Sequence, residues 1–183
     1  AAALPFIRAI NKVFKKEAED MDMNIIYDVA HNIGKIEKYK VNGKMKDLLI
    51  HRKGATRSFG PGNDELWGEY KKYGQPVIVG GSMETGSYLL VGTKKAEEIT
   101  FGSTCHGAGR TMSRTQAKRT FRGEKLQRDM EERGIYVKTA SMSGLAEEAG
   151  NAYKDVSEVV NTTEKAGLST KVVAFRPLGN IKG

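Results

Sequence analysis

Asn42-Gly43 fixes one element of the fold by itself, because both residues tolerate the positive φ angles of a type I′ turn. The segments on either side, KIEKYKV at 35–41 and KMKDLLIH at 44–51, have the character of β-strands. Together they predict an antiparallel β-hairpin. This hairpin leads directly into a basic segment, HRKGATR, at residues 51–57.

The rest of the chain mixes strand and helix patterns without a regular alternation. Further strands are predicted over 24–30, 76–79, 87–93, 134–140 and 171–177. Helices are predicted over 1–16, 65–71, 112–134, 143–153 and 154–167, with an interruption of the third at Gly123. No internal repeat or low-complexity linker is present. This irregular order favours the α+β class over a regular α/β winding.

Composition limits the class of protein more than its activity. The 183 residues, 39% hydrophobic, are enough for one globular domain or part of a larger one. The chain has no apolar run near 18 residues and no signal peptide, and its single cysteine cannot form an internal disulfide, so we expect a cytoplasmic protein. The formal net charge of +8 favours polyanionic partners without specifying one. Because the chain lacks an initiator methionine and starts at once with a helical pattern, we expect the C-terminal part of a longer polypeptide.

Residues 101–114, FGSTCHGAGRTMSR, carry groups suited to phosphate chemistry. His106 is followed by Gly107 and Gly109, whose missing side chains let a phosphorylated group approach the backbone. A neutral imidazole can attack phosphorus. The alternative is a glycine turn next to a hydrogen-bonded core histidine, and the spacing alone does not decide between them.

A row of basic residues follows this histidine. Arg110 and Arg114 are four residues apart, so on a helix they would share one face, and Lys118 and Arg122 would extend it. Like charges at this spacing disfavour an isolated helix, and an anionic partner would relieve the cost. A solvated basic helix is the alternative reading.

Cys105 and His31 offer further chemistry. Cys105 is a second candidate nucleophile, but no acidic residue stands close in sequence to form a Cys-His set, so a packing role is favoured. His31 and Asn32 end the predicted buried strand 24–30, where one imidazole could bind a metal or simply be a core residue. His51 is interpreted as structural or exposed, so a complete metal site would need ligands from elsewhere.

Two more segments suit phosphates or nucleotides. Lys53, flanked by Arg52 and Arg57, fits phosphate contact, although a solvated basic loop explains the composition slightly better. The loop GGSMETGS at 80–87 could line a nucleotide pocket with small residues and hydroxyls. It matches neither of the common glycine-rich phosphate motifs.

Several strings, taken together and in order, resemble the C-terminal part of the RtcB family of RNA-splicing ligases. They are YDVAHNIGK, HRKGATRSF, GQPV with GSM, TFGSTCHGAGR, EEA with AYK, and the terminal KG. The resemblance runs from about residue 24 to residue 183, and STCHGAGR is its most specific string. It implies an RtcB-like α+β fold in which residues 1–183 form the C-terminal part of a single catalytic domain.

The resemblance also implies an activity: GTP- and Mn²⁺-dependent joining of an RNA 3′-phosphate or 2′,3′-cyclic phosphate to a 5′-hydroxyl, in tRNA splicing and RNA repair. His106 would take up GMP through an N–P bond and pass it to the RNA 3′-phosphate, after which the 5′-hydroxyl expels GMP. His31 matches the family's manganese ligand, and Asn32 matches a neighbour that contacts the nucleotide. The implied partners are RNA, as tRNA halves or broken ends, and archease.

Other positions match the family residue by residue. The matched nucleotide-binding positions are Gly80, Gly81, Ser82, Met83, Ser87, Gly107, Ala108, Gly109, Tyr153 and Lys182, the last two beside the guanine base. Lys53, Arg110 and Arg114 match basic residues implicated in phosphate or RNA contact. Gly80 stands where relatives often carry proline. The family's other manganese ligands, an Asp, a Cys and two His, lie upstream of this region, so the resemblance implies that these 183 residues are inactive without the upstream part.

Two alternatives belong to other classes. A histidine among glycines and arginines also suits a phosphohistidine-forming phosphohydrolase, which would form its phosphoenzyme from a small ester without GTP. A non-catalytic basic RNA-binding module would explain the charge through phosphate contacts alone and would make His106 dispensable.

Overall fold

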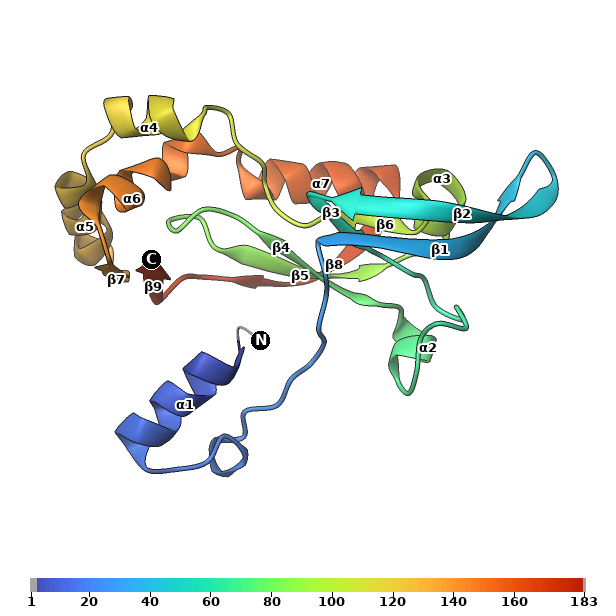
Figure 1. Ribbon diagram of the computed structural model, residues 1–183, viewed down its shortest axis with the longest axis horizontal. Coiled ribbons are helices and arrows are strands. Elements are labelled where there is room, and N and C mark those ends of the chain that lie inside the picture. Colours follow the sequence, from blue (N-terminus) through green and yellow to red (C-terminus); the bar gives the residue numbers. More distant parts are fainter. Residues whose placement is uncertain (1–2, 183) are drawn as a thin grey trace.

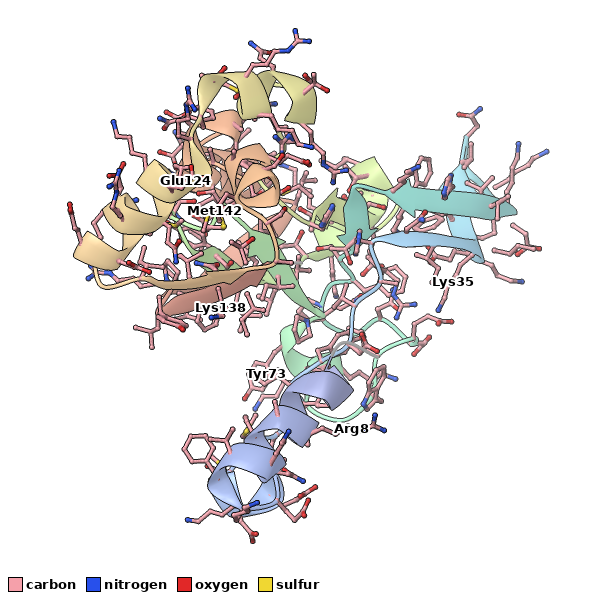
Figure 2. The ribbon with its side chains drawn as sticks, turned by 60° about the vertical axis from the view of Figure 1, so that its left-hand side comes forward. Arg8, Lys35, Tyr73, Glu124, Lys138 and Met142 are labelled. Atoms are coloured by element: carbon pink, nitrogen blue, oxygen red, sulfur yellow. The ribbon has the colours of Figure 1, made fainter. Side chains whose placement is uncertain are left out.

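The computed structural model describes residues 3–182, with side chains from Ile7 to Ile181. Within them, seven α-helices and nine strands in four small sheets confirm the predicted α+β class. Figure 1 shows the hairpin β1–β2 at one end, helices α4 to α6 at the other, and α7 along the sheet between them. Helix α1, which carries Arg8, lies apart from the sheets in this view and in the turned view of Figure 2. Across the described residues, no helix is both long and apolar enough to span a membrane.

The elements have the following bounds. The helices are α1 Ala3–Phe14, α2 Tyr70–Tyr73, α3 Lys94–Thr100, α4 Arg114–Thr120, α5 Gly123–Glu132, α6 Met142–Glu147 and α7 Val156–Ala166, with 3₁₀ turns at Glu19–Met21 and Gly150–Ala152. The strands are β1 Asn32–Val41, β2 Lys44–Lys53, β3 Ala55–Arg57, β4 Pro76–Gly80, β5 Ser87–Gly92, β6 Ser103–Cys105, β7 Tyr136–Thr139, β8 Ser169–Phe175 and β9 Gly179–Lys182.

The predicted hairpin is confirmed and extends further than expected. Asn42 and Gly43 have φ values of 51° and 80° between antiparallel strands β1 and β2, as a type I′ turn requires. The pairing continues to Asn32 opposite Lys53. The hairpin therefore brings the residue after His31 next to the basic segment that ends β2.

The central sheet has the strand order β4–β5–β8, with both neighbouring pairs antiparallel. Val77, Val79 and Leu90 on one face pack with Val156 and Val160 of α7, and all five are at most 1% exposed. Burying a side chain of this size contributes about 1.5–3 kcal/mol. The same cluster includes Ala108 and touches Cys105, so the core of the domain lies directly under the segment that carries His106.

The predicted helix over 112–134 is two helices. The hydroxyl of Ser113 caps α4 by accepting the Gln116 N–H, and α4 ends where Phe121 adopts an extended conformation. Gly123, where the interruption was expected, instead begins α5 and packs closely on α6, because a Cβ there would lie 2.2 Å from the Met142 carbonyl oxygen. The break therefore falls at 121–122 and separates Arg122 from α4.

The prediction of a buried strand over 24–30 is wrong. Residues 23–30 have no regular structure, and Ile25 and Ile26 are 72% and 62% exposed. A strand needs a partner strand for its backbone groups, and nothing within 3–182 pairs with this segment. Instead, Tyr27 stacks on Trp67 at 5.3 Å between ring centroids and meets the edge of Tyr70.

Four short elements escaped the sequence patterns. Strands β3 and β6 pair antiparallel over three residues each, and β9 pairs in parallel with β7 where a tail was expected. Helix α3 begins at an N-cap, Thr93, whose hydroxyl accepts the Ala96 N–H. The predicted helix over 65–71 is only the single turn α2, further along the chain.

Candidate active site

Two histidines from distant parts of the sequence lie against each other. The rings of His31, just before β1, and His106, just after β6, are stacked with centroids 4.4 Å apart and planes 21° apart. Sequence reasoning named these two residues separately, and the fold brings them together. Neither imidazole has a hydrogen-bond partner within the part of the chain that the structure describes, which speaks against a satisfied core histidine.

The short segment after β2 holds both histidines in place. The Gly54 N–H donates to the carbonyl of His31 at 3.1 Å, and Ala55 pairs with Cys105, the residue before His106. The Thr56 hydroxyl donates to the Ala30 carbonyl at 3.2 Å. Residues 54–56 therefore set the spacing between the two rings through backbone contacts.

The environment of His106 keeps its imidazole neutral. Burial is the main cause that lowers the pKa of His106, and repulsion from a charged His31 adds to it. A lower pKa means that the ring carries a free lone pair at neutral pH, as a nucleophile requires. The same burial raises the pKa of the Cys105 thiol and disfavours its thiolate, in keeping with the packing role expected for this cysteine.

The loop after His106 is fastened to the predicted nucleotide loop. The Gly80 N–H donates to the His106 carbonyl at 3.0 Å, and the Ala108 N–H donates to the Gly80 carbonyl at 2.8 Å. A side chain at Gly81 would lie 2.4 Å from the Gly86 carbonyl oxygen, so this turn closes only around glycine. Gly109, with φ of +75° and open space around its Cα, leaves room beside the imidazole for a bulky group.

Other residues of the 80–87 loop stabilise its conformation. The Ser82 hydroxyl accepts the N–H groups of Glu84 and Thr85, and Ser87 opens β5 opposite Gly80. The Met83 side chain is only 4% exposed, in a cluster with Met130, Val137 and Leu145. Among the loop residues that match the family's nucleotide-binding positions, Met83 thus anchors the loop through its buried side chain.

Glu84 is a residue that sequence reasoning missed. Its carboxylate accepts the Gly150 N–H at 2.8 Å and forms an ion pair with Arg133 of the segment after α5. Gly150 lies three residues before Tyr153. Glu84 therefore ties the glycine loop to the segment that carries the predicted guanine contact, and no local sequence signal could have shown a link across 66 residues.

Arg110 does not lie on a helix, so the expected shared face with Arg114 is wrong. Its guanidinium donates to the carbonyls of Met112 and Glu147 and, at 2.8 Å, to the Tyr153 hydroxyl. It also lies 3.5 Å from a carboxylate oxygen of Glu148 and 4.7 Å from the centre of the Tyr153 ring. Arg110 thus fastens the end of the His106 loop to the 147–153 segment.

Tyr153 is held from two sides. Its hydroxyl accepts from Arg110 and donates to Glu148 at 2.5 Å. Burial and the neighbouring Glu148 carboxylate raise the pKa of Tyr153, so the phenol remains protonated. The hydroxyl of Tyr153 is thus engaged on both sides, and the Arg110 guanidinium lies over one face of its ring.

The anionic partner expected for the basic helix, α4, is a glutamate of the same chain. Glu147 pairs with Lys118 and with Arg114, whose Nε is 3.7 Å away, and the hydrogen bond from Lys118 is the main cause that lowers the pKa of Glu147. The Arg114 side chain nevertheless remains 72% exposed. Arg122 stands apart, at the N-cap of α5.

The basic segment 51–57 is not the solvated loop that its composition favoured. Arg52 is 2% exposed and forms a bidentate ion pair with Glu37 of β1, at 2.8 and 2.7 Å. His51 is exposed, as expected. Lys53 is exposed at the end of β2, where its backbone pairs with Asn32 and its ammonium has no hydrogen bond or ion pair to any described residue. The backbone of Lys182 pairs with Thr139, and its side chain lies outside the described side chains.

A metal could take only part of its ligands from this region. His31 offers an exposed imidazole without a hydrogen bond, a free donor of the kind manganese accepts. Among residues 3–182, however, no three His, Cys, Asp or Glu side chains come together as a metal site. The described residues therefore fit one ligand position and do not hold a metal ion alone.

An α+β scaffold that presents a neutral, unpartnered histidine between two glycine loops defines a class of site suited to phosphoryl or nucleotidyl transfer. The sequence comparisons identify the particular family. The chain belongs to the RtcB family, because the family model described as tRNA-splicing ligase RtcB matches residues 3–183.

Relatives named tRNA-splicing ligase RtcB are similar over nearly the whole chain. The identity is 51% over 176 residues to the protein of Nanoarchaeum equitans, 50% over 175 residues to that of Pyrococcus abyssi and 52% over 172 residues to that of Archaeoglobus fulgidus. These alignments cover 96%, 96% and 94% of this chain, but only 37%, 19% and 36% of the relatives. The chain therefore spans well under half the length of these curated relatives.

Proposed function

We propose that this chain is the C-terminal part of the catalytic domain of a GTP- and manganese-dependent RNA ligase, with an RtcB-like fold. The complete protein would join an RNA 3′-phosphate or 2′,3′-cyclic phosphate to a 5′-hydroxyl. The observation that carries the proposal is the neutral His106, stacked on His31 and fixed to a glycine loop. The similarity to proteins named tRNA-splicing ligase supports it.

In this proposal His106 is the nucleophile. Its lone pair attacks the α-phosphorus of GTP, an N–P bond forms, and pyrophosphate leaves. The GMP group then passes from His106 to the RNA 3′-phosphate, and attack by the 5′-hydroxyl forms the new phosphodiester and releases GMP. A manganese ion, when bound, would offset the phosphate charge, with His31 as one of its ligands.

The surrounding residues have binding roles in the same proposal. Asn32 and the backbone of 80–82 and 107–109 would receive the phosphates and sugar of the nucleotide, where no large side chain stands in the way. Tyr153 would meet the guanine base with its ring, and Lys182 would donate to the base. Lys53, without a partner, and Arg114, largely exposed, are the cations that we assign to phosphate or RNA contact. Arg110 would contact a phosphate only by giving up one of its present partners.

The partners follow from the same proposal. The substrate would be RNA, as tRNA halves or broken ends, and the upstream part of the protein would supply the remaining metal ligands. Archease is proposed as an activating partner on the family resemblance. The free thiol of Cys105 fits a reducing compartment, and we place the activity in the cytoplasm.

Replacing His106 tests the proposal. In the complete protein, His106→Asn should abolish transfer of label from α-phosphate-labelled GTP, whereas the matched variant Cys105→Ser should keep it. The labelled adduct should be labile in acid and stable in alkali, as a histidine phosphoramidate is. His106→Asn should still seal RNA whose 3′-end already carries guanylate, because that step follows the action of His106. Label that persists in His106→Asn would move the nucleophile elsewhere.

A further inference from the structure

We propose that Arg52 is a positioning residue for His106. Its buried guanidinium holds the turn from which β6 starts, and β6 ends one residue before His106. This inference rests on the proposed function, because it concerns how the nucleophile is placed. Nothing in the local sequence distinguished Arg52 from its solvated basic neighbours.

The guanidinium of Arg52 uses its donors on two separate parts of the chain. On one side it forms the bidentate ion pair with Glu37. On the other side Nε donates to the Ser103 hydroxyl at 2.9 Å, and a terminal nitrogen donates to the Phe101 carbonyl at 2.8 Å. Arg52 therefore joins the hairpin to residues 101–103, the entrance of β6.

The turn that Arg52 holds has an unfavourable backbone conformation. Phe101 and Gly102 both have positive φ, of 52° and 58°. An aromatic residue rarely adopts this left-handed region. Gly102 cannot be replaced without a clash, because a Cβ there would lie 2.6 Å from the Phe59 ring. The donors of Arg52 stabilise a turn that the chain would not favour by itself.

This contact completes the placement of both histidines. Gly54, two residues after Arg52, already holds the carbonyl of His31, and Ala55 pairs with Cys105. The side chain of Arg52 adds a fixed point at Ser103, three residues before His106. The consecutive residues 52–55 thus set the start of β6, its end and the position of His31, and with them the stacking of the two rings.

The chemistry of the site requires arginine rather than any cation. A guanidinium presents five donors in a rigid fork, whereas a lysine ammonium cannot reach a carboxylate, a hydroxyl and a carbonyl in different directions. Although burial alone would raise the pKa of Glu37, hydrogen bonds from Arg52 and Tyr39 keep it below its ordinary value. Glu37 is thus ionised and balances the charge of Arg52 inside the protein.

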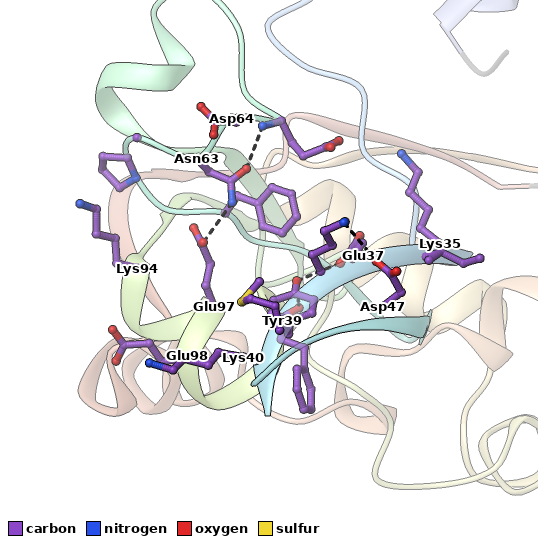
Figure 3. Close-up of a pocket in the computed structure, with 18 residues that line it drawn as sticks. Lys35, Glu37, Tyr39, Lys40, Asp47, Asn63, Asp64, Lys94, Glu97 and Glu98 are labelled. Carbon is purple, nitrogen blue, oxygen red and sulfur yellow. Dashed lines mark hydrogen bonds and ion pairs between the residues drawn. The ribbon is translucent and has the colours of Figure 1, made fainter. Parts of the chain in front are cut away.

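Figure 3 shows Glu37 and Tyr39 together on β1, beside a cleft of about 1030 Å³ between the hairpin and α3. The Tyr39 hydroxyl lies 2.8 Å from Glu37 and 2.7 Å from the Phe101 carbonyl. Tyr39 therefore supports the same turn from the cleft side, whereas Arg52 holds it from within.

The experiment compares two Arg→Lys variants in the complete protein. Arg52→Lys keeps the charge opposite Glu37 and loses the fork. Arg57→Lys is the matched control, because the backbone of Arg57 pairs with Ser103 in β3–β6 whereas its mostly buried side chain contacts Gln75, Glu65 and the Phe59 ring and makes no contact with 101–103. The readouts are the rate constant of guanylate transfer to His106 at saturating GTP and the GTP concentration for half-saturation.

Arg52→Lys should lower the rate constant by about 10- to 100-fold, because a displacement near 1 Å of a reacting group has that effect. The half-saturating GTP concentration should stay within about twofold, and Arg57→Lys should leave both values within about twofold. Wild-type rates in Arg52→Lys would overturn the inference. A rate that falls only in proportion to the unfolded fraction of Arg52→Lys would also overturn it by showing a general effect of instability.

A second variant and a second measurement keep the test independent of folding and of activity. Ser103→Ala removes one acceptor of Arg52 and should slow the transfer by about threefold, and an unchanged rate would count against the inference. A crystal structure of Arg52→Lys should show ring centroids of His31 and His106 further apart than 4.4 Å. Unchanged stacking in Arg52→Lys would refute the positioning role, whatever the labelling results. Failure of the wild-type protein to take up label from GTP would instead refute the proposed function.

Discussion

Replacing Arg110 with glutamine should destabilise the protein, whereas the same change at Arg114 should not. The two arginines are four residues apart in sequence and appear equivalent there. Arg110 makes three side-chain hydrogen bonds, lies 3.5 Å from Glu148 and covers the ring of Tyr153. Arg114 is 72% exposed and has one distant carboxylate neighbour. Glutamine keeps the length of the side chain and removes the charge and most of the donors at both positions.

The magnitude follows from the contacts of Arg110. A hydrogen bond that involves a charged group is worth about 1.5–3 kcal/mol, and a cation over an aromatic ring about 0.5–1 kcal/mol. Because these contacts share one side chain, their energies do not add, and we expect Arg110→Gln to lower the free energy of unfolding by about 2–4 kcal/mol. A domain of 150–250 residues loses about 2–4 °C per kcal/mol and a longer protein loses less, so the melting temperature of the complete protein should fall by at least about 2 °C.

The assay is thermal unfolding of the complete protein, followed by circular dichroism, with guanylate labelling measured well below the transition. Arg114→Gln should keep the melting temperature within about 1 °C, since exposed ion pairs contribute little. It should weaken RNA binding, more so at low salt, because a phosphate contact is screened by ions. Equal melting temperatures of the two variants and the wild type would refute the view that Arg110 fastens the His106 loop.

Three further outcomes are expected. Alkylation of Cys105, followed by mass spectrometry of its peptide, should be slower at pH 7 than that of a free thiol and should accelerate as the pH rises, because burial raises the pKa of the thiol and reactivity needs the thiolate; fast labelling at pH 7 would contradict this. Lys182→Ala in the complete protein should weaken GTP use and reduce discrimination against ATP, because adenine carries a donor where guanine carries an acceptor; unchanged nucleotide preference would show that the Lys182 side chain does not contact the base. Calorimetric titration of manganese into the 183-residue chain should show no tight binding, since His31 offers one ligand and the described residues bring no group of three together; tight one-to-one binding that His31→Ala abolishes would refute that reasoning.

Sequence reasoning succeeded where structure depends on neighbouring residues. The turn at Asn42-Gly43 and the strands beside it follow from local conformational preference, so the hairpin was predicted correctly. The strands β4, β5, β7 and β8 were also predicted, because each contains or adjoins a short run of apolar, mostly β-branched or aromatic residues. In contrast, β3 and β6 have three residues each and owe their existence to each other, so no local pattern marks them. The segment 24–30 has strand propensity without a partner in the described chain, and propensity alone does not make a strand.

The candidate site shows the same division. The spacing of His106, Gly107 and Gly109 identified a candidate nucleophile, and the resemblance added His31, but only the fold places the two rings together. The contacts of Arg110 with Glu147 and Tyr153 cross 37 and 43 residues, so spacing within one segment wrongly placed Arg110 on a helix with Arg114. The burial that sets Arg52 apart from the exposed Lys53 depends on Glu37 in the neighbouring strand, which no local pattern reveals.

The stacked pair of Tyr27 and Trp67 gives the site an optical reporter. Trp67 is the only tryptophan among the 183 residues, and its ring rests on Tyr27, four residues before His31. A chain spans at most about 3.6 Å per residue, so the Cα atoms of Tyr27 and His31 lie within about 15 Å of each other. We expect a ligand that reaches His31 to shift the 27–31 segment, to change the solvent around the indole, which is 60% exposed, and so to move its emission. In the 183-residue chain, fluorescence of this one side chain would then report occupation of the site in real time, without a labelled nucleotide.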